Sequence, residues 1–177
     1  MGEYTVNKPE AMSISIGVLG GIDTYLTATV IPVPVWVTFI AWASFFTLGG
    51  GTTGFIKSVA SNLVGISIAS LTLLSVAALS GNPVVVAICV GVGSAAMVQA
   101  SKLDLISFTP AIVFGFASTV GTTVATGNPI VTGGLENPAL IAAAAMILGA
   151  AFGYLSEVIG NVLSAKSVEI EGEKSSA

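Results

Sequence analysis

Residues 49–55 read GGGTTGF, and residues 121–125 read GTTVA. Each Gly-Thr-Thr lies between two strongly apolar stretches, and Phe46 and Phe116 stand five residues before Gly51 and Gly121. Glycine frees the backbone and threonine supplies hydroxyl groups, so the repeated pattern indicates a recurring polar, irregular segment inside an apolar chain.

The composition is that of a membrane protein. Of the 177 residues, 54% are hydrophobic and 8% are charged, and the mean hydropathy is +0.97. A soluble domain carries about 25% charged residues. The chain has no arginine, no histidine and five lysines, so it lacks the cationic patch that nucleic-acid binding requires.

Apolar stretches of roughly 20 residues predict membrane-spanning helices. We expect six, separated by Pro and Gly breaks, near residues 13–32, 35–50, 58–80, 84–101, 105–123 and 138–163. The resulting organisation is a cytoplasmic N-terminal segment (1–12), a six-span membrane domain (13–164) and a disordered acidic cytoplasmic tail (165–177).

The lysines support this topology. If the N-terminus is cytoplasmic, six spans place all five lysines on the cytoplasmic side: Lys8, Lys57, Lys102, Lys166 and Lys174. The connections near 32–34, 81–83 and 124–137 carry none. By the positive-inside rule, we expect both termini in the cytoplasm.

The two Gly-Thr-Thr motifs further suggest an inverted repeat. Aligning them pairs Phe46 with Phe116, and Asn62 with Asn137 after a short insertion. Each copy, about residues 13–81 and 84–163, then contains three spans, and an odd number of spans reverses orientation. The predicted fold is an all-α integral membrane protein of two inverted three-helix repeats, with broken or re-entrant segments.

Asp23 is the most informative single residue because it lies within the apolar run SISIGVLGGIDTYLTATVI. A carboxylate at that depth costs several kcal/mol unless it is paired, hydrated or protonated. It either lines an aqueous path, is neutral, or faces an oligomer interface. Thr27 lies four residues on, on the same helix face. Glu157 is closer to a helix end and is expected to reach the interface or Lys166.

These features predict a substrate pathway, with ordinary helix packing as the alternative for its glycine, threonine and phenylalanine residues. The candidate residues are Asp23, Thr27, Phe46, Gly51, Thr52, Thr53, Asn62, Phe116, Gly121, Thr122, Thr123 and Asn137.

No catalytic or cofactor-binding pattern is present. Without histidine there is no Ser-His-Asp relay and no HExxH zinc site. The run GVGSAA at 91–96 lies inside a predicted span and lacks the strand-turn-helix context of a nucleotide loop. We therefore expect no enzyme activity, no cofactor and no metal.

The segment VGVGSAAMVQASKLDLISFTPAIVFGFASTVG (90–121) resembles the matching segment of the YcdZ-like family of small bacterial inner-membrane proteins. The resemblance rests on Gln99-Ala-Ser-Lys102, then Leu105, Ser107, Phe108 and Pro110, followed by a span rich in small residues. It implies an integral inner-membrane protein of about six spans and assigns no site residues.

Three functions remain open on the sequence. The first is an oligomeric channel or facilitator for a small polar solute such as urea, an amide, ammonia or a short organic acid. The second is a proton- or sodium-coupled transporter that uses Asp23. The third is a structural or regulatory membrane subunit. The expected partners are the lipid bilayer, the solute and further copies of the chain.

Overall fold

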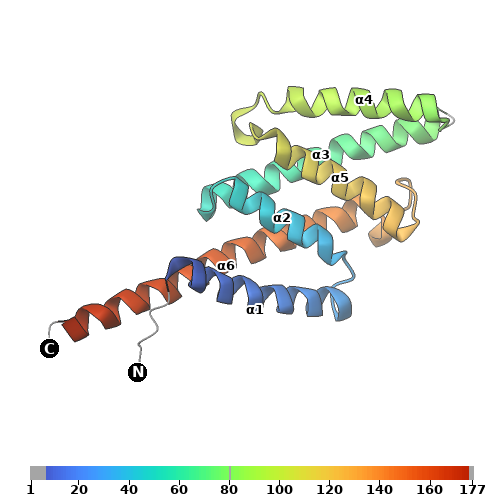
Figure 1. The fold of residues 1–177 in the computed structure, drawn as a ribbon. Coiled ribbons are helices and arrows are strands. Elements are labelled where there is room, and N and C mark those ends of the chain that lie inside the picture. The colour runs from blue at the N-terminus through green and yellow to red at the C-terminus, as the bar shows by residue number, and fades with distance from the viewer. Residues whose placement is uncertain (1–6, 80, 176–177) are drawn as a thin grey trace.

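The computed structural model describes residues 7–79 and 81–175, with side-chain surroundings through residue 165. Within these ranges the chain forms six α-helices and no strand (Figure 1): α1 Lys8–Thr29, α2 Val35–Thr47, α3 Gly51–Ala78, α4 Pro83–Ala100, α5 Thr109–Thr126 and α6 Pro138–Ser175. Two 3₁₀ turns, η1 Asp104–Ile106 and η2 Gly134–Glu136, lie in the connections that flank α5.

The helix ends follow from local sequence. Asn7 caps α1 in a reciprocal capping box with Glu10, and the Asn82 side chain accepts from the first backbone N–H groups of α4. Between α2 and α3, the three glycines at 49–51 have φ values of 90°, 67° and 60°. Only glycine adopts this backbone readily, so the glycine run makes the tight turn.

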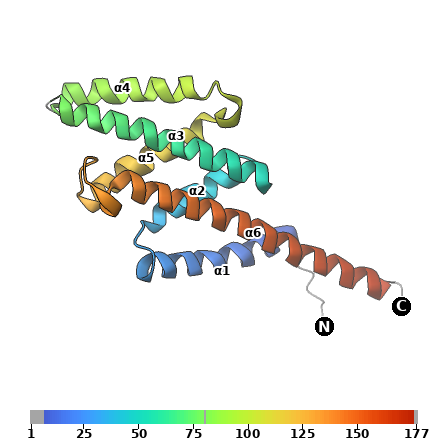
Figure 2. The ribbon, with the colours of Figure 1, turned by 180° about the vertical axis from the view of Figure 1, so that it is seen from behind.

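Consecutive helices run antiparallel, and the start of α1 and the end of α6 lie at the same end of the bundle (Figures 1 and 2). The closest pairs are α3 with α5 and α2 with α6. Helix α4 lies on the outer side of α3, and α1 lies on the outer side of α6 (Figure 1). The connection after α4, which carries Lys102, lies at this same end. The start of α3, which carries Lys57, lies there too.

Glycines set the two close pairs. A Cβ atom at Gly65 of α3 would overlap the Ile112 carbonyl of α5, and one at Gly115 of α5 would overlap the Asn62 carbonyl of α3. In the same way, Gly149 of α6 meets the Thr38 carbonyl of α2. Small residues at helix crossings let backbones approach closely, which is how helices associate without a hydrophobic driving force.

Four helices are long and apolar enough to cross a membrane: α1, α3, α4 and residues 138–165 of α6. Helix α2 is apolar but has only 13 residues, which at 1.5 Å per residue is about 20 Å. Six spans remain a prediction: among the described residues, four helices meet the criterion of length and hydropathy, whereas α2 is shorter and α5 does not meet it. An all-α fold is confirmed for the described residues, and its long apolar helices are compatible with a membrane location.

Several boundaries also differ from those expected. Helix α3 begins at Gly51 and not near 58, so the first Gly-Thr-Thr opens a helix. The second lies inside α5, which is continuous from Thr109 to Thr126, and is neither broken nor re-entrant there. Helix α6 continues through residues 165–175, where we expected a disordered tail; residues 1–6, 176 and 177 lie outside the described residues.

Candidate functional site

Asp23 is completely buried between α1 and α2. Its Oδ2 atom is paired with the hydroxyl of Thr38, which lies in the first turn of α2. Its other oxygen, Oδ1, is buried and has no hydrogen-bond partner. A buried carboxyl group with one unpartnered oxygen is rare in a folded protein, because each unpaired buried polar atom costs free energy.

The hydroxyls nearest to Asp23 in sequence do not reach its carboxyl group. Thr27 is buried and donates to the Asp23 backbone carbonyl at 2.8 Å, and Thr24 donates to the Gly20 carbonyl at 2.8 Å. Tyr25 is exposed. The partner is instead Thr38, fifteen residues away, which sequence spacing could not identify because the contact depends on how α2 returns along α1.

A second polar group lies between α2 and α3. The Ser58 hydroxyl donates to Ser44 Oγ at 2.9 Å, Ser44 Oγ donates to Asn62 Oδ1 at 3.3 Å, and Asn62 Nδ2 donates to Ser58 Oγ at 3.3 Å. All three side chains are fully buried. They form a closed hydrogen-bonded ring, which we call the Ser44–Ser58–Asn62 ring.

Further buried hydroxyls lie on α5 and α3, and three of them have no hydrogen-bond partner. Gly115 of α5 packs on the Asn62 backbone, and Ser118, Thr119 and Thr122 follow at helical spacing on the buried side. Thr119 donates to the Gly115 carbonyl at 2.9 Å. The hydroxyls of Ser118 and Thr122 have no partner, and neither does that of Ser61 beside the ring. We call Ser61, Ser118, Thr119 and Thr122, together with the ring, the hydroxyl seam.

The first Gly-Thr-Thr lies at the opposite end from Asp23, where α3 begins. The Gly51 N–H donates to Glu157 Oε2 of α6 at 2.6 Å. Glu157 thus caps α3 from a neighbouring helix, and the surroundings of the Lys166 side chain lie outside the described residues. Thr52 and Thr53 are exposed, and Thr52 lines a small surface hollow of about 250 Å³ with Phe55, Ala151 and Tyr154.

The second Gly-Thr-Thr lies in the last third of α5, toward the other end of the bundle. A Cβ at Gly121 would lie 2.6 Å from the Trp36 ring of α2, so this glycine provides contact between α2 and α5. Thr122 belongs to the hydroxyl seam, and half-buried Thr123 donates to the Thr119 carbonyl at 3.0 Å. The two motifs therefore do not meet.

The remaining candidate residues are dispersed. Phe46 packs in a cluster with Leu19, Trp42 and Phe152, whereas Phe116 packs in a different cluster. Asn137 caps the start of α6: its side chain accepts from Ala139 N at 2.9 Å and donates to two carbonyls of the preceding loop. Of the predicted residues, the fold brings only Asn62 and Thr122 into the seam.

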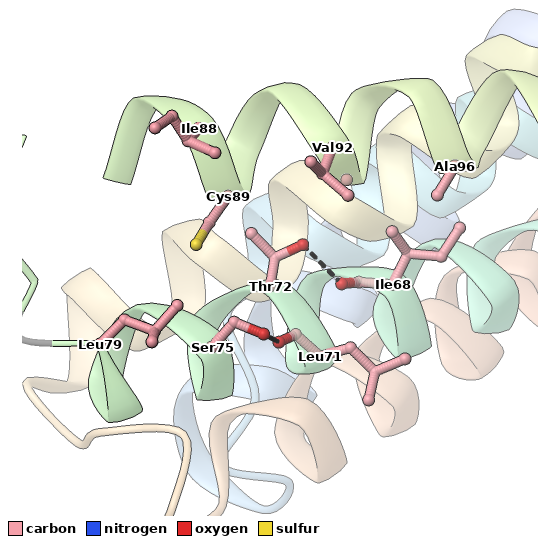
Figure 3. A pocket seen from close by; sticks show the side chains of 10 residues that line it. Ile68, Leu71, Thr72, Ser75, Leu79, Ile88, Cys89, Val92 and Ala96 are labelled. Atoms are coloured by element: carbon pink, nitrogen blue, oxygen red, sulfur yellow. Dashed lines mark hydrogen bonds between the residues drawn. The ribbon is translucent and has the colours of Figure 1, made fainter. Parts of the chain in front are cut away.

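A further hollow, larger than the one beside Thr52, is not polar. It lies between α3 and α4, has a volume of about 420 Å³, and is lined mainly by Ile, Leu and Val side chains (Figure 3). Its two hydroxyls are bound to their own helix, Thr72 to Ile68 O at 2.8 Å and Ser75 to Leu71 O at 2.9 Å. The chemistry of this lining fits hydrocarbon and not a polar solute.

The residues that sequence reasoning missed are the serines and threonines of the apolar spans: Thr38, Ser44, Ser58, Ser61, Ser118 and Thr119. Their signal is present as hydroxyls three or four residues apart, Ser58 with Ser61 and Asn62, and Ser118 with Thr122. It is weak because hydroxyls in apolar helices commonly bond to their own backbone. Over residues 7–79 and 81–165, no three Cys, Asp or Glu side chains lie close enough to hold a metal.

The fold is all-α over the described residues, and its long apolar helices are compatible with a membrane protein. Residues 13–161 match the family described as "Protein of unknown function (DUF1097)", and the chain belongs to that family. This is compatible with the YcdZ-like resemblance, although that name is not what the match gives. No curated protein and no solved structure matches the chain.

Proposed function

We propose that the protein is a facilitator for a small polar solute, such as urea, an amide, ammonia or a short organic acid, and that it acts without covalent chemistry. The observation that carries this proposal is the hydroxyl seam. Hydroxyl and amide groups run from the centre of an apolar bundle along α5, and three of the hydroxyls have no partner in the protein.

Each unpartnered buried polar group costs about 1–3 kcal/mol. Apolar side chains at Ser61, Ser118 and Thr122 would avoid that cost. Their hydroxyls therefore fit a role in hydrogen bonding to a solute that passes through the protein. A solute with both donors and acceptors matches hydroxyl and carboxamide groups. Because these side chains are fully buried, the structure corresponds to an occluded state of such a path.

We further propose an inverted repeat in which α1, α2 and α3 correspond to α4, α5 and α6. The crossing of Thr38 with Gly149 corresponds to that of Ile112 with Gly65. The same register matches Thr72 with Ser156. Both contact the outer helix of the other half, Thr72 at Gly93 of α4 and Ser156 at Ser15 of α1.

This register supersedes the alignment on Gly-Thr-Thr, because it pairs Phe116 with Trp42 and not with Phe46. It also matches Ser44 with Ser118, while the positions of Ser58 and Asn62 are taken by Ala142 and Met146. The hydrogen-bonded ring is therefore present in one half only. In the other half, the Ser118 hydroxyl has no hydrogen-bond partner, so the hydroxyl seam retains an unpaired polar group there.

The proposal extends to location and assembly. The concentration of lysines at the end with the termini supports a cytoplasmic placement of that end, in the bacterial inner membrane. A homo-oligomer is supported by the many exposed apolar side chains of α4, including Val84, Ile88 and Val92. Cross-linking of the protein in native membranes would show ladders of a single chain if the assembly is homomeric.

Solute flux into proteoliposomes tests the function. We expect faster shrinkage or swelling than in empty vesicles for at least one solute of a panel of urea, acetamide, ammonia and acetate. Flux equal to that of empty vesicles for every solute would overturn the proposal. That result, together with co-purification of a single partner protein, would instead support a structural or regulatory subunit.

Variants then locate the path. Thr122→Val keeps the side-chain shape and removes a hydroxyl that bonds to nothing, so it should fold normally while lowering flux several-fold. Ser67→Ala is the matched control: its exposed hydroxyl bonds only to the Leu63 carbonyl of its own helix. Equal flux in Thr122→Val and the wild type would exclude the seam as the path.

Asp23 supports a second candidate, a coupled secondary transporter. A buried carboxyl group in a membrane-type helix is a frequent coupling site, and the Asp23 Oδ1 atom is unpartnered. Accumulation of solute against its gradient, driven by a pH or sodium gradient and lost in Asp23→Asn, would establish coupling. Retained accumulation in that variant would rule it out.

A further inference from the structure

The hydroxyl of Thr38 lies between two oxygen atoms. It is 2.6 Å from the Val35 carbonyl and also contacts Asp23 Oδ2. A hydroxyl has a single proton, so it can donate to only one of them. Other hydroxyls on α1 and α2 donate to a backbone carbonyl three or four residues earlier, as Thr24, Thr29 and Thr47 do.

The direction of these two bonds decides the state of Asp23. If Thr38 donates to Val35 O, the close contact with Oδ2 requires a proton on Asp23, which then donates to Thr38. If Asp23 were ionised, Thr38 would donate to it, and the Val35 carbonyl would face an oxygen with no proton between them. The ionised form would also leave Oδ1 buried without a donor.

No charged group in the described part of the chain faces Asp23. Helix α1 packs on α6 and α2, and α2 contains no ionisable side chain. The contacts of Met12 with Gly160 and of Ser15 with Ser156 place Asp23 level with about residue 148 of α6.

The ionisable side chains of α6 nearest that level are engaged elsewhere. Tyr154 packs on Phe45 and Phe55, and Glu157 caps α3 at the other end of the bundle. The surroundings of Asp23 do not fit a metal cation, because such ions take several oxygen ligands and Oδ1 has no hydrogen-bonding partner.

We propose that Asp23 is a proton-binding site that is neutral in this structure, and that release of its proton reverses the hydrogen bond of Thr38. The Asp23 carboxylic acid gives its proton to water entering from the α1–α2 end. Thr38 then turns its hydroxyl from Val35 O to the new carboxylate. The first turn of α2 then loses one hydrogen bond. Protonation of Asp23 is thereby linked to the packing of α2 against α1.

This site deepens the proposed function by naming the proton as the ion that acts on it, and it rests on that function only for its effect on flux. The proton itself can be observed without transport. Infrared spectroscopy of the full-length protein in liposomes detects the carbonyl stretch of a protonated carboxylic acid. We expect this band at neutral pH in the wild type and its loss in Asp23→Asn.

Two variants sharpen the measurement. Asp104→Asn replaces an exposed aspartate and should leave the band unchanged. Thr38→Val removes the hydroxyl partner, so the band should remain but shift to higher frequency. No difference between wild type and Asp23→Asn at neutral pH would overturn the proposal. Loss of the band on adding sodium at constant pH would also overturn it, by assigning a cation site.

The outcomes separate this inference from the proposed function. An acid band that is lost in Asp23→Asn, with no solute flux, keeps the proton site and removes the facilitator. Solute flux without the infrared band keeps the facilitator and removes the proton site. If both hold, flux should change with pH in the wild type and become independent of pH in Asp23→Asn.

Discussion

Two carboxyl groups inside the bundle, Glu157 toward one end and Asp23 toward the other, have opposite surroundings. Glu157 accepts a hydrogen bond from Gly51 N at 2.6 Å at the first turn of α3, where the helix dipole favours a negative charge. Asp23 has one hydroxyl contact and one unpartnered oxygen, and no backbone N–H in the described part of the chain donates to its carboxyl group.

The difference separates structure from function. Glu157 is placed where a carboxylate stabilises the fold, because it supplies an acceptor that the α3 terminus needs. At the position of Asp23, a carboxylate does not stabilise the fold. A residue that costs stability where it stands is a better candidate for function than one that contributes to it. Substitutions at the two ends should therefore have opposite consequences.

The largest effect is expected for Gly50→Ala. Gly50 has φ 67°, and a Cβ there would lie 2.5 Å from Glu157 Oε1. Backbone strain and displacement of the Glu157 cap together should lower the free energy of unfolding by about 3 kcal/mol, measured by denaturation in detergent.

Gly51→Ala is the matched control for Gly50→Ala. Its φ is 60°, but a Cβ there meets nothing within 4 Å, so it adds strain without the collision. We expect the gap between the two variants to close when each is combined with Glu157→Ala. A gap that persists would show that Gly50 does not act through Glu157.

Glu157→Ala should lower the free energy of unfolding by about 1–2 kcal/mol, because α3 loses a charge-assisted cap. Glu157→Gln should lose part of this, since the amide oxygen still accepts from Gly51 N but carries no charge. The infrared band of Asp23 and the pH dependence of flux should not change. A change in either would mean that the two ends are coupled.

Asp23→Asn should alter the free energy of unfolding by less than about 1 kcal/mol, and Asp23→Leu should be neutral or stabilising. The reason is that Thr38 keeps the Val35 carbonyl as an acceptor when the carboxyl group is removed. Thermal unfolding of both variants provides the measurement. Strong destabilisation by Asn would show that Asp23 is a structural residue like Glu157.

The smallest effect is expected for Thr27→Val, about 0.5 kcal/mol or less, because its hydroxyl bonds only to backbone carbonyls of α1. Thr38→Val, by contrast, should shift the Asp23 infrared band. If Thr27→Val shifted that band as strongly, the assignment of Thr38 as the carboxyl partner would be wrong.

The sequence predicted the outline of the fold well. Hydropathy and the Pro and Gly breaks indicated an all-α membrane-type protein, and all six predicted spans contain a helix. Asp23 was identified because a charge in an apolar run needs no tertiary information to be noticed. Its partner Thr38 and the cap that Glu157 provides could not be identified from the sequence. Both contacts join different helices, and packing decides which sides of those helices face each other.

The Gly-Thr-Thr motif shows the limit most clearly. The same three residues open a helix at 51–53, after a glycine turn, and lie within a continuous helix at 121–123. The three residues alone do not distinguish the two cases, because threonine and glycine are both tolerated in helices packed against neighbours. The glycines at 49 and 50 mark the first copy as a turn, and the second copy lacks them. The tertiary contacts differ as well, since Trp36 covers Gly121 and Glu157 caps Gly51.

The sequence by itself determined that this chain is apolar, helical and bounded by lysines at one end, since these depend on composition and order alone. The tertiary structure decided which hydroxyls meet, which glycines carry the crossings, and which of the two carboxyl groups is left without a full set of partners. Those outcomes depend on the rotation of each helix about its axis, and close contacts such as that of Gly65 with Ile112 fix that rotation.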